Sequence, residues 1–176
     1  ILGGPIFLLI AFLIKIDSRG PIIFRQKRVG KNGQIFTMYK FRTMVEKAEQ
    51  LKKTYLFLNE ADGPVFKIKN DPRLTKIGKV LTKTGLDELP QLVNILKGEM
   101  SLVGPRPLPV DEERKIPARY QARRLVKPGI FSPWTASGAS HDNFYKWMES
   151  DIEYANAYSF FEDLKVVFKT LGMLLK

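Results

Sequence analysis

Residues 86–107 read LDELPQLVNILKGEMSLVGPRP, and the predicted fold and site both depend on this stretch. It begins with two adjacent carboxylates, Asp87 and Glu88. Apolar residues follow at helical spacing, namely Leu89, Leu92, Val93 and Leu96. Pro90 is compatible with a helix capped by Asp87, because the first-turn N–H groups have no intrahelical partner. Gly98 stands where a helix typically ends. The stretch therefore predicts a short helix that opens on two acids.

These paired acids allow two interpretations. They are typical of an ordinary acidic helix start. The positive end of a helix dipole also stabilises anions, whether carboxylate or phosphate. Arg106 follows between two prolines in a very basic chain, which favours an anion-handling site without excluding the ordinary helix start.

Composition restricts the available chemistry to carboxylates, lysine and arginine. The chain has 176 residues, enough for one domain with a core. Its 29 Lys+Arg against 18 Asp+Glu give a net charge of +11, which indicates a polyanionic partner. Cysteine is absent from the sequence and His141 is the only histidine, so thiol chemistry is excluded and histidine-based zinc or Ser-His-Asp sites are disfavoured. A metal would be a hard cation bound by oxygen, with Mg²⁺ the natural choice beside phosphates.

The first 14 residues carry no charge. A helix needs about 20 apolar residues to cross a bilayer, so this run alone is too short. The chain begins at Ile1 without a methionine, and we expect it to be cut from a longer polypeptide. Since proline bends a helix, we predict that residues 1–16 are the C-terminal part of a re-entrant membrane helix broken at Pro5. A buried core helix and a signal peptide are the alternatives.

Residues 17–176 are predicted to form one cytosolic domain of mixed α/β class, rich in helix and with few short strands. The predicted strands are 22–24, 34–42 and 63–69, with a hairpin turn at 30–33. The predicted helices are 43–60, 76–83, 110–124 and two pieces from 142 onward. The last piece, 160–175, is basic and amphipathic, so it either lies in a membrane interface or packs on the core.

Together these features indicate membrane-associated, metal-assisted phosphoryl chemistry. Arg73 and Arg106 can each bind phosphate bidentately. A carboxylate can attack a phosphoryl group when a divalent cation neutralises the repulsion between the two anions. The residues themselves do not name a substrate.

Several motifs in order resemble the bacterial sugar transferase family, the monotopic polyprenol-phosphate phosphoglycosyl transferases, over nearly the whole chain. The matching segments are FRQKRVG (24–30), YKFRTM (39–44), FK (66–67), NDPR (70–73), LDELPQL (86–92), Asn94 with Gly98, MSLVGPRP (100–107) and KPGI (127–130). The resemblance implies a monotopic catalytic domain with interfacial helices, at the cytoplasmic face of the bacterial inner membrane.

The resemblance also implies a Mg²⁺-dependent phosphoglycosyl transferase. Asp87 would take sugar-1-phosphate from a UDP-sugar and release UMP. Undecaprenyl phosphate would then receive it, giving undecaprenyl-diphospho-sugar in the first membrane step of capsule, exopolysaccharide or O-antigen assembly. Glu88 would assist, and both acids would hold Mg²⁺. The residues expected to bind substrate or phosphate are Arg106, Arg73, Lys67, Lys40, Arg42, Arg28 and Asp151. The expected partners include the phospholipid membrane and a second copy of the chain.

Departures from the family pattern, at Thr82, Gly85 and Ala139 among others, leave an alternative open. The chain could be a catalytically degenerate, basic membrane-surface module of the same fold. A nucleic-acid binder is disfavoured, because the sequence lacks an aromatic-interleaved basic motif and the apolar first segment would have no role.

Overall fold

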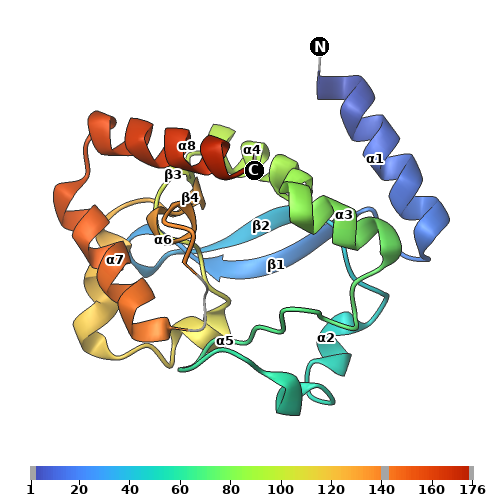
Figure 1. Cartoon of the computed structure of the whole chain (residues 1–176), viewed down its shortest axis with the longest axis horizontal. Helices are drawn as coiled ribbons and strands as arrows, with labels where there is room; N and C mark the ends of the chain where they lie inside the picture. Colours follow the sequence, from blue (N-terminus) through green and yellow to red (C-terminus); the bar gives the residue numbers. More distant parts are fainter. Residues whose placement is uncertain (1–2, 140–142, 175–176) are drawn as a thin grey trace.

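The computed structural model of the protein describes residues 3–139 and 143–174, which form helices around two small sheets (Figure 1). Ile1 and His141 lie outside the described residues. The elements are α1 (Gly3–Asp17), β1 (Ile23–Val29), η1 (Lys31–Gly33), β2 (Ile35–Phe41), α2 (Ala48–Leu51), η2 (Leu56–Leu58), α3 (Lys76–Thr84), η3 (Leu86–Gln91), α4 (Leu92–Leu96), β3 (Ser101–Val103), α5 (Val110–Glu113), η4 (Ala118–Leu125), β4 (Gly129–Phe131), α6 (Pro133–Ala136), α7 (Phe144–Ala157) and α8 (Phe160–Leu174), where η marks a 3₁₀ helix. This composition confirms the predicted mixed, helix-rich α/β class.

An antiparallel hairpin of β1 and β2 runs through the middle of the molecule. Its turn places Asn32 and Gly33 at positive φ, a region that asparagine and glycine tolerate. The first strand is longer than predicted, because the basic residues 25–28 continue it instead of forming a loop.

The pattern of β2 places a lysine at the edge of the core. Side chains alternate between the two faces of a strand, so Lys40 shares a face with Phe36 and Met38. Phe36 and Met38 are buried, and Lys40 continues their row toward η3, against which β2 packs.

A second, parallel sheet pairs β3 with β4. The residue after β3, Gly104, lies so close to the first residue of β4, Gly129, that both positions require glycine. A Cβ on Gly104 would lie 2.3 Å from the carbonyl oxygen of Lys127, and one on Gly129 would lie 2.1 Å from the Gly104 nitrogen. This crossing places the proline-flanked Arg106 directly after β3.

Helix α1 buries one face on the domain and exposes the other. Ile10 and Ile14 pack against Phe41 and Leu81. The exposed apolar side chains are Ile6, Leu8, Leu9, Phe12 and Ile16. Within residues 3–139 and 143–174, no helix combines the length and apolar character that crossing a bilayer requires. Pro5 lies in the first turn of α1, and the re-entrant course broken at Pro5 stays a prediction, as does the division of the chain at residue 16.

Three predicted elements are wrong. Residues 43–60 contain only α2 and η2 between turns, and Lys47 has a left-handed conformation (φ 63°) at the start of α2. Residues 63–69 form a loop. Residues 110–124 divide into α5 and η4, because Pro117 cannot continue a helix. The helix predicted at 76–83 and the two C-terminal helices are confirmed as α3, α7 and α8.

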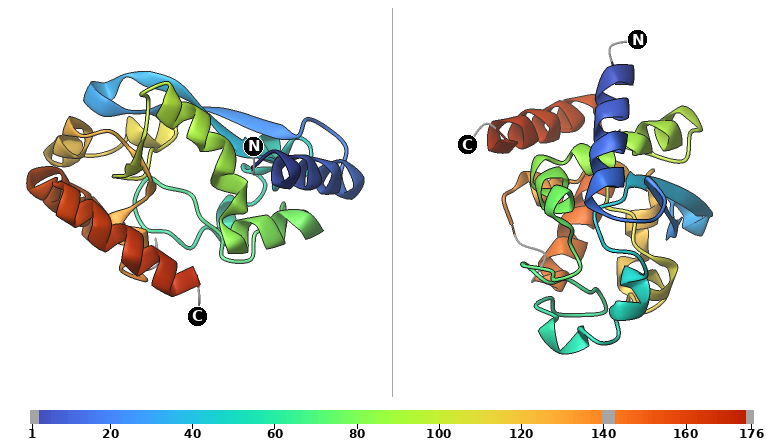
Figure 2. Two further views of the ribbon diagram at one scale, coloured as in Figure 1. Left: turned by 90° about the horizontal axis from the view of Figure 1, so that it is seen from above. Right: turned by 90° about the vertical axis from the view of Figure 1, so that its right-hand side faces the viewer.

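Helices α1, α4 and α8 lie on the same side of the hairpin (Figures 1 and 2). Exposed apolar side chains on α4 and α8 include Leu92, Val93, Leu96, Phe160, Phe161, Phe168 and Leu171. The short helix η2 lies on the opposite side of the molecule (Figure 1) and carries the exposed Phe57.

Candidate active site

The segment that carries the two acids begins differently from the predicted helix. Gly85 ends α3 at φ 71° and also caps η3, so Asp87 lies inside a 3₁₀ turn and is not the N-cap. Pro90 fits within this turn, and α4 continues the chain. Gly98, at φ 76°, follows the end of α4 as predicted. The positive end of a long helix dipole is therefore not what surrounds the acids.

Asn94 fixes this segment against the hairpin. Its side chain is fully buried. It donates to the carbonyl of Thr37 (2.7 Å) and accepts from the N–H of Tyr39 (3.2 Å), so it bonds β2 from both sides of Met38. Buried side-chain hydrogen bonds to backbone specify one arrangement, and this one holds η3 beside Lys40.

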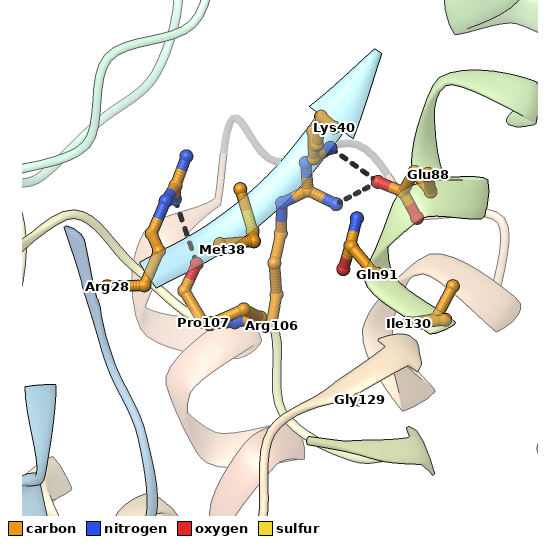
Figure 3. Close-up of a pocket in the computed structure, with 9 residues that line it drawn as sticks. All are labelled: Arg28, Met38, Lys40, Glu88, Gln91, Arg106, Pro107, Gly129 and Ile130. Carbon is orange, nitrogen blue, oxygen red and sulfur yellow. Dashed lines mark hydrogen bonds and ion pairs between the residues drawn. The ribbon is translucent and has the colours of Figure 1, made fainter. Parts of the chain in front are cut away.

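Glu88 is the centre of a charged cluster with two cations (Figure 3). The Lys40 ammonium donates to Glu88 Oε1 at 2.7 Å, and Arg106 Nη1 lies 3.5 Å from the same oxygen. Asp87 is more weakly paired, since its Oδ2 lies 3.6 Å from the Lys40 ammonium. The cluster brings together residues from β2, η3 and the segment after β3.

The two neighbouring acids have pKa values that shift in opposite directions. Burial raises the pKa of Asp87, with Lys40 opposing the shift and Glu88 adding to it. Burial alone would also raise the pKa of Glu88, but Lys40 and Arg106 outweigh it and hold that pKa below its ordinary value. Glu88 is thus the more firmly ionised acid, and Asp87 is the more basic carboxylate.

A small pocket opens beside this cluster (Figure 3). It is partly open to solvent and is lined by Arg28, Met38, Lys40, Glu88, Gln91, Arg106, Pro107, Gly129 and Ile130. Asp87 lies next to the pocket and not in its lining.

Arg28 adds a third cation to the pocket. Its Nη1 donates to the carbonyl of Pro107 (2.8 Å), while its buried Nε has no partner. Burial and the nearby Arg106 lower the pKa of Arg28 to about 10, a value at which it still carries a positive charge at neutral pH. Three cations, Arg28, Lys40 and Arg106, beside the two acids leave a net positive charge, which is typical of a site for phosphorylated ligands.

The acids fit a Mg²⁺ ion only with help from a ligand. Among the described residues, no group of three or more histidine, aspartate or glutamate side chains could hold a metal. Mg²⁺ is usually bound through one or two carboxylates together with substrate phosphates and waters. Asp87 and Glu88 meet that requirement, and an ion there would share them with Lys40.

Two of the arginines predicted to bind phosphate are engaged elsewhere. Arg73 is buried and forms an ion pair with Asp71 (2.6 Å), and its Nη1 donates to the carbonyl of Ala48 (3.1 Å). Arg42 is buried at the end of α1, where its Nη2 donates to the carbonyl and hydroxyl oxygens of Ser18 (2.7 and 2.9 Å). Neither lines the pocket, and their phosphate-binding roles stay predictions.

Lys67 and Asp151 are also absent from the pocket lining. Lys67 lies in the loop after η2, where its backbone N–H donates to Asn59 Oδ1 (2.8 Å). Asp151 is completely buried on α7 and pairs with Arg123 at 2.7 Å. Asp151 is therefore held inside the domain, and its predicted role in substrate binding stays a prediction.

Residue-by-residue sequence interpretation missed Gln91 and Arg123. Gln91 is buried and lines the pocket, and its position three residues after Glu88 on one turn was an available signal. Arg123 gave no such signal, because its ion pairs join residues from distant parts of the chain.

The fold is mixed α/β, with a basic pocket beside two acids, and the comparisons with known proteins show the family. A family model described as bacterial sugar transferase matches residues 1–176. The chain is 45% identical over 183 residues to the galactosyl transferase CpsE of Streptococcus agalactiae serotype III, covering 99% of this chain and 41% of that protein.

Two further relatives cover the chain nearly as fully. The exopolysaccharide production protein ExoY of Rhizobium meliloti is 39% identical over 175 residues, 97% of this chain and 77% of that protein. The UDP-glucose:undecaprenyl-phosphate glucose-1-phosphate transferase of Klebsiella pneumoniae is 38% identical over 179 residues, 97% of this chain and 36% of that protein. The chain therefore spans about two fifths of some relatives and three quarters of another. It belongs to the bacterial sugar transferase family.

Proposed function

We propose that this protein transfers sugar-1-phosphate from a UDP-sugar to undecaprenyl phosphate. The observation that carries the proposal is the pairing of Asp87 and Glu88 with Lys40, and of Glu88 with Arg106, beside a pocket that Arg28 also lines. The name of the Klebsiella relative, which states a UDP-glucose donor and an undecaprenyl-phosphate acceptor, supports the same reaction class.

Asp87 is the proposed nucleophile. In the first half-reaction its carboxylate oxygen bonds to the phosphorus that carries the sugar. The bond from that phosphorus to the bridging oxygen breaks, and UMP leaves with the electron pair. In the second half-reaction an oxygen of undecaprenyl phosphate bonds to the same phosphorus, and the bond to Asp87 breaks. The products are undecaprenyl-diphospho-sugar and a regenerated carboxylate, with no net proton transfer.

The electrostatics of the two acids support this division of roles. The raised pKa of Asp87 marks the more basic, hence more nucleophilic, oxygen. Glu88, fully paired with Lys40, keeps that lysine and Arg106 in place beside the pocket. Arg28 and Arg106 would bind the diphosphate oxygens, since guanidinium groups match phosphate geometry. Asp87 and Glu88 would hold Mg²⁺, whose charge would offset the repulsion between the carboxylate and the diphosphate.

UMP release from a panel of UDP-sugars, with undecaprenyl phosphate and the full protein in nanodiscs, tests the proposal. Asp87→Asn should abolish release, while Glu153→Gln, which alters an exposed acid on α7, should keep it. Release by the Asp87→Asn variant at the wild-type rate would overturn Asp87 as nucleophile. A wild-type protein that binds membranes but releases UMP from no UDP-sugar would be the degenerate surface module.

We further propose that the protein acts at the cytoplasmic face of the bacterial inner membrane. The support is the side of the molecule formed by α1, α4 and α8, with exposed apolar residues such as Leu96, Phe160 and Phe161 (Figure 2). Such a side matches an interfacial surface, and a net charge of +11 favours anionic headgroups. The homodimer stays a prediction.

The membrane proposal has a matched control within the chain. Replacing Phe160 and Phe161 by serine should weaken flotation with anionic phospholipid vesicles. Phe57→Ser, which removes an equally exposed aromatic ring from the opposite side, should not. Equal flotation of both variants would contradict the assignment of this side to the membrane.

A further inference from the structure

The backbone that carries Arg106 is held in an unusual way. Pro105 and Pro107 have no N–H group, so segment 105–107 offers a single donor and cannot be fixed by a regular strand ladder. Its carbonyl oxygens are bonded one by one instead. These bonds are Gly129 N–H to Pro105 O (3.1 Å), Arg123 Nη2 to Arg106 O (2.7 Å) and Arg28 Nη1 to Pro107 O (2.8 Å).

Arg123 is itself held by two sealed carboxylates. Its Nε and Nη2 donate to Asp151 Oδ2 at 2.9 and 2.7 Å, and its Nη1 donates to Glu113 Oε2 at 2.9 Å. All three residues are nearly or completely buried, at 4%, 0% and 2% exposure respectively for Arg123, Asp151 and Glu113. A buried charge is tolerated only where its pairing is complete, so the guanidinium has one favourable orientation.

That orientation connects α7 to the pocket. Asp151 on α7 directs Arg123 on η4, and Arg123 directs the Arg106 carbonyl. The Arg106 side chain then reaches Glu88 (Figure 3). No member of the Asp151–Arg123 pair needs to contact substrate for this chain of contacts to affect the site.

We propose that Asp151 and Arg123 are positioning residues, which fix the backbone of Arg106 so that its guanidinium stands at the phosphate-binding pocket. The inference rests on the proposed function for its kinetic consequence, and on the hydrogen bonds alone for its structural one. It gives Asp151 a role that needs no direct contact with substrate.

A second buried ion pair supplies a matched control. Asp71 and Arg73 are each 6% exposed and pair at 2.6 Å, so their rupture should disturb the protein similarly. Their contacts run to the Ala48 carbonyl and the Phe66 ring, and not to segment 105–107. A general loss of stability would therefore follow from either rupture, whereas a loss transmitted through Arg106 would follow only from changing Asp151 or Arg123.

The first test is a double-mutant cycle on kcat/KM for UMP release. Asp151→Asn should reduce kcat/KM about tenfold in the wild-type background, a size common for residues that orient a functional group. It should reduce it less than about twofold when Arg106 is already alanine, because the group it positions is gone. Asp71→Asn should give the same factor in both backgrounds. Equal factors for Asp151→Asn in both backgrounds would overturn the proposal.

The second test needs no turnover. Hydrogen exchange of a peptide spanning 102–110 should be faster in Asp151→Asn than in Asp71→Asn, each in the full protein. Arg123→Lys, which keeps the charge but lacks the fork geometry, should reproduce the effect even if Asp151→Asn folds poorly. Unchanged exchange in Arg123→Lys would refute the positioning role. A wild-type protein without UMP release would defeat the proposed function, while the exchange result would still decide this inference.

Discussion

This protein has two clusters of acidic and basic residues, which are connected by the hydrogen bond from Arg123 to the Arg106 carbonyl. The two clusters differ in their balance of charge and in the distances between their ion pairs. At the pocket, Lys40, Arg106 and Arg28 outnumber the acids, and two of the ion-pair distances are 3.5 and 3.6 Å. In the buried cluster, Arg123 and Arg124 match Glu113 and Asp151 in number, with distances of 2.7 to 2.9 Å. The same residue types line an open, positively charged pocket in one place and form a buried ion-pair cluster in the other.

The hydrogen-bond donors of the arginines separate the two clusters. The Nε, Nη1 and Nη2 atoms of Arg123 all donate to groups inside the protein, whereas the Arg28 Nε is unpartnered and the Arg106 side chain is about one third exposed. Unused donors and excess positive charge are available to an anion, and a closed cluster has neither. This difference supports the two proposals, that the first cluster binds an anion and that the second positions Arg106.

The largest expected effect is a loss of stability when the buried cluster loses its central arginine. Arg123→Ala would leave Asp151 and Glu113 without their shared partner, and breaking a buried ion pair typically costs about 3–5 kcal/mol. Urea unfolding of the detergent-solubilised protein should show this loss. A decrease below about 1 kcal/mol would mean that the cluster is not the closed structural unit described here.

The pH dependence of stability should report Asp151. Burial outweighs the attraction of Arg123 and raises the pKa of Asp151 to about 6. Relative to high pH, the stabilising contribution of this group is present below its unfolded pKa of about 4 and is lost as pH rises through about 6. The shift of about 2 units corresponds to up to about 3 kcal/mol. The difference in unfolding free energy between wild type and Asp151→Asn should fall over this window, and a flat difference would contradict the assignment.

Removing a cation from the pocket cluster should affect activity more than stability. Arg106→Ala should lower kcat/KM for UMP release about 100-fold, as expected for a group that stabilises transferred phosphoryl charge. Its unfolding free energy should stay within about 0.5 kcal/mol of wild type, because the side chain is partly exposed. Arg114→Ala, at an exposed arginine outside the pocket, is the matched control. Equal losses of activity in both variants would remove Arg106 from the site.

An exposed ion pair should give the smallest change in the free energy of unfolding. Lys165 and Glu162 pair at 2.5 Å on α8, where their side chains are 63% and 38% exposed. Surface pairs of this kind contribute little, so Lys165→Ala should change the unfolding free energy by less than about 0.5 kcal/mol. A larger change would show that the contribution of an ion pair to stability depends on a short distance between its atoms and not on its burial.

The sequence predicted most of the elements whose signal is local. The hairpin follows from its turn residues and alternation, and α3 and α8 follow from apolar periodicity. Residues 43–60 have charges that suit a solvated helix, yet too few of their side chains are buried to stabilise one. The prediction that Asp87 is the N-cap was wrong. Gly85, two residues earlier, takes a left-handed conformation and caps the 3₁₀ turn.

The site was predictable only in part, for a similar reason. Asp87, Glu88 and Arg106 lie in one stretch, so local motifs could identify them. The approach of Lys40 to Glu88 joins residues 48 positions apart and depends on how β2 packs against η3. Arg42, Arg73 and Asp151 have the residue types of a phosphate site, but whether such a group faces a ligand or a partner is decided by tertiary burial, which residue type does not encode.

Mass spectrometry can detect the proposed covalent intermediate, in which Asp87 carries the sugar phosphate, and so tests directly whether Asp87 is the nucleophile. The full protein in nanodiscs would be incubated with a UDP-sugar and Mg²⁺ in the absence of undecaprenyl phosphate, then digested. We expect a peptide containing Asp87 to gain the mass of one sugar phosphate, and no such gain in Asp87→Asn. Turnover without any adduct on Asp87, or an adduct on a different residue, would contradict this expectation.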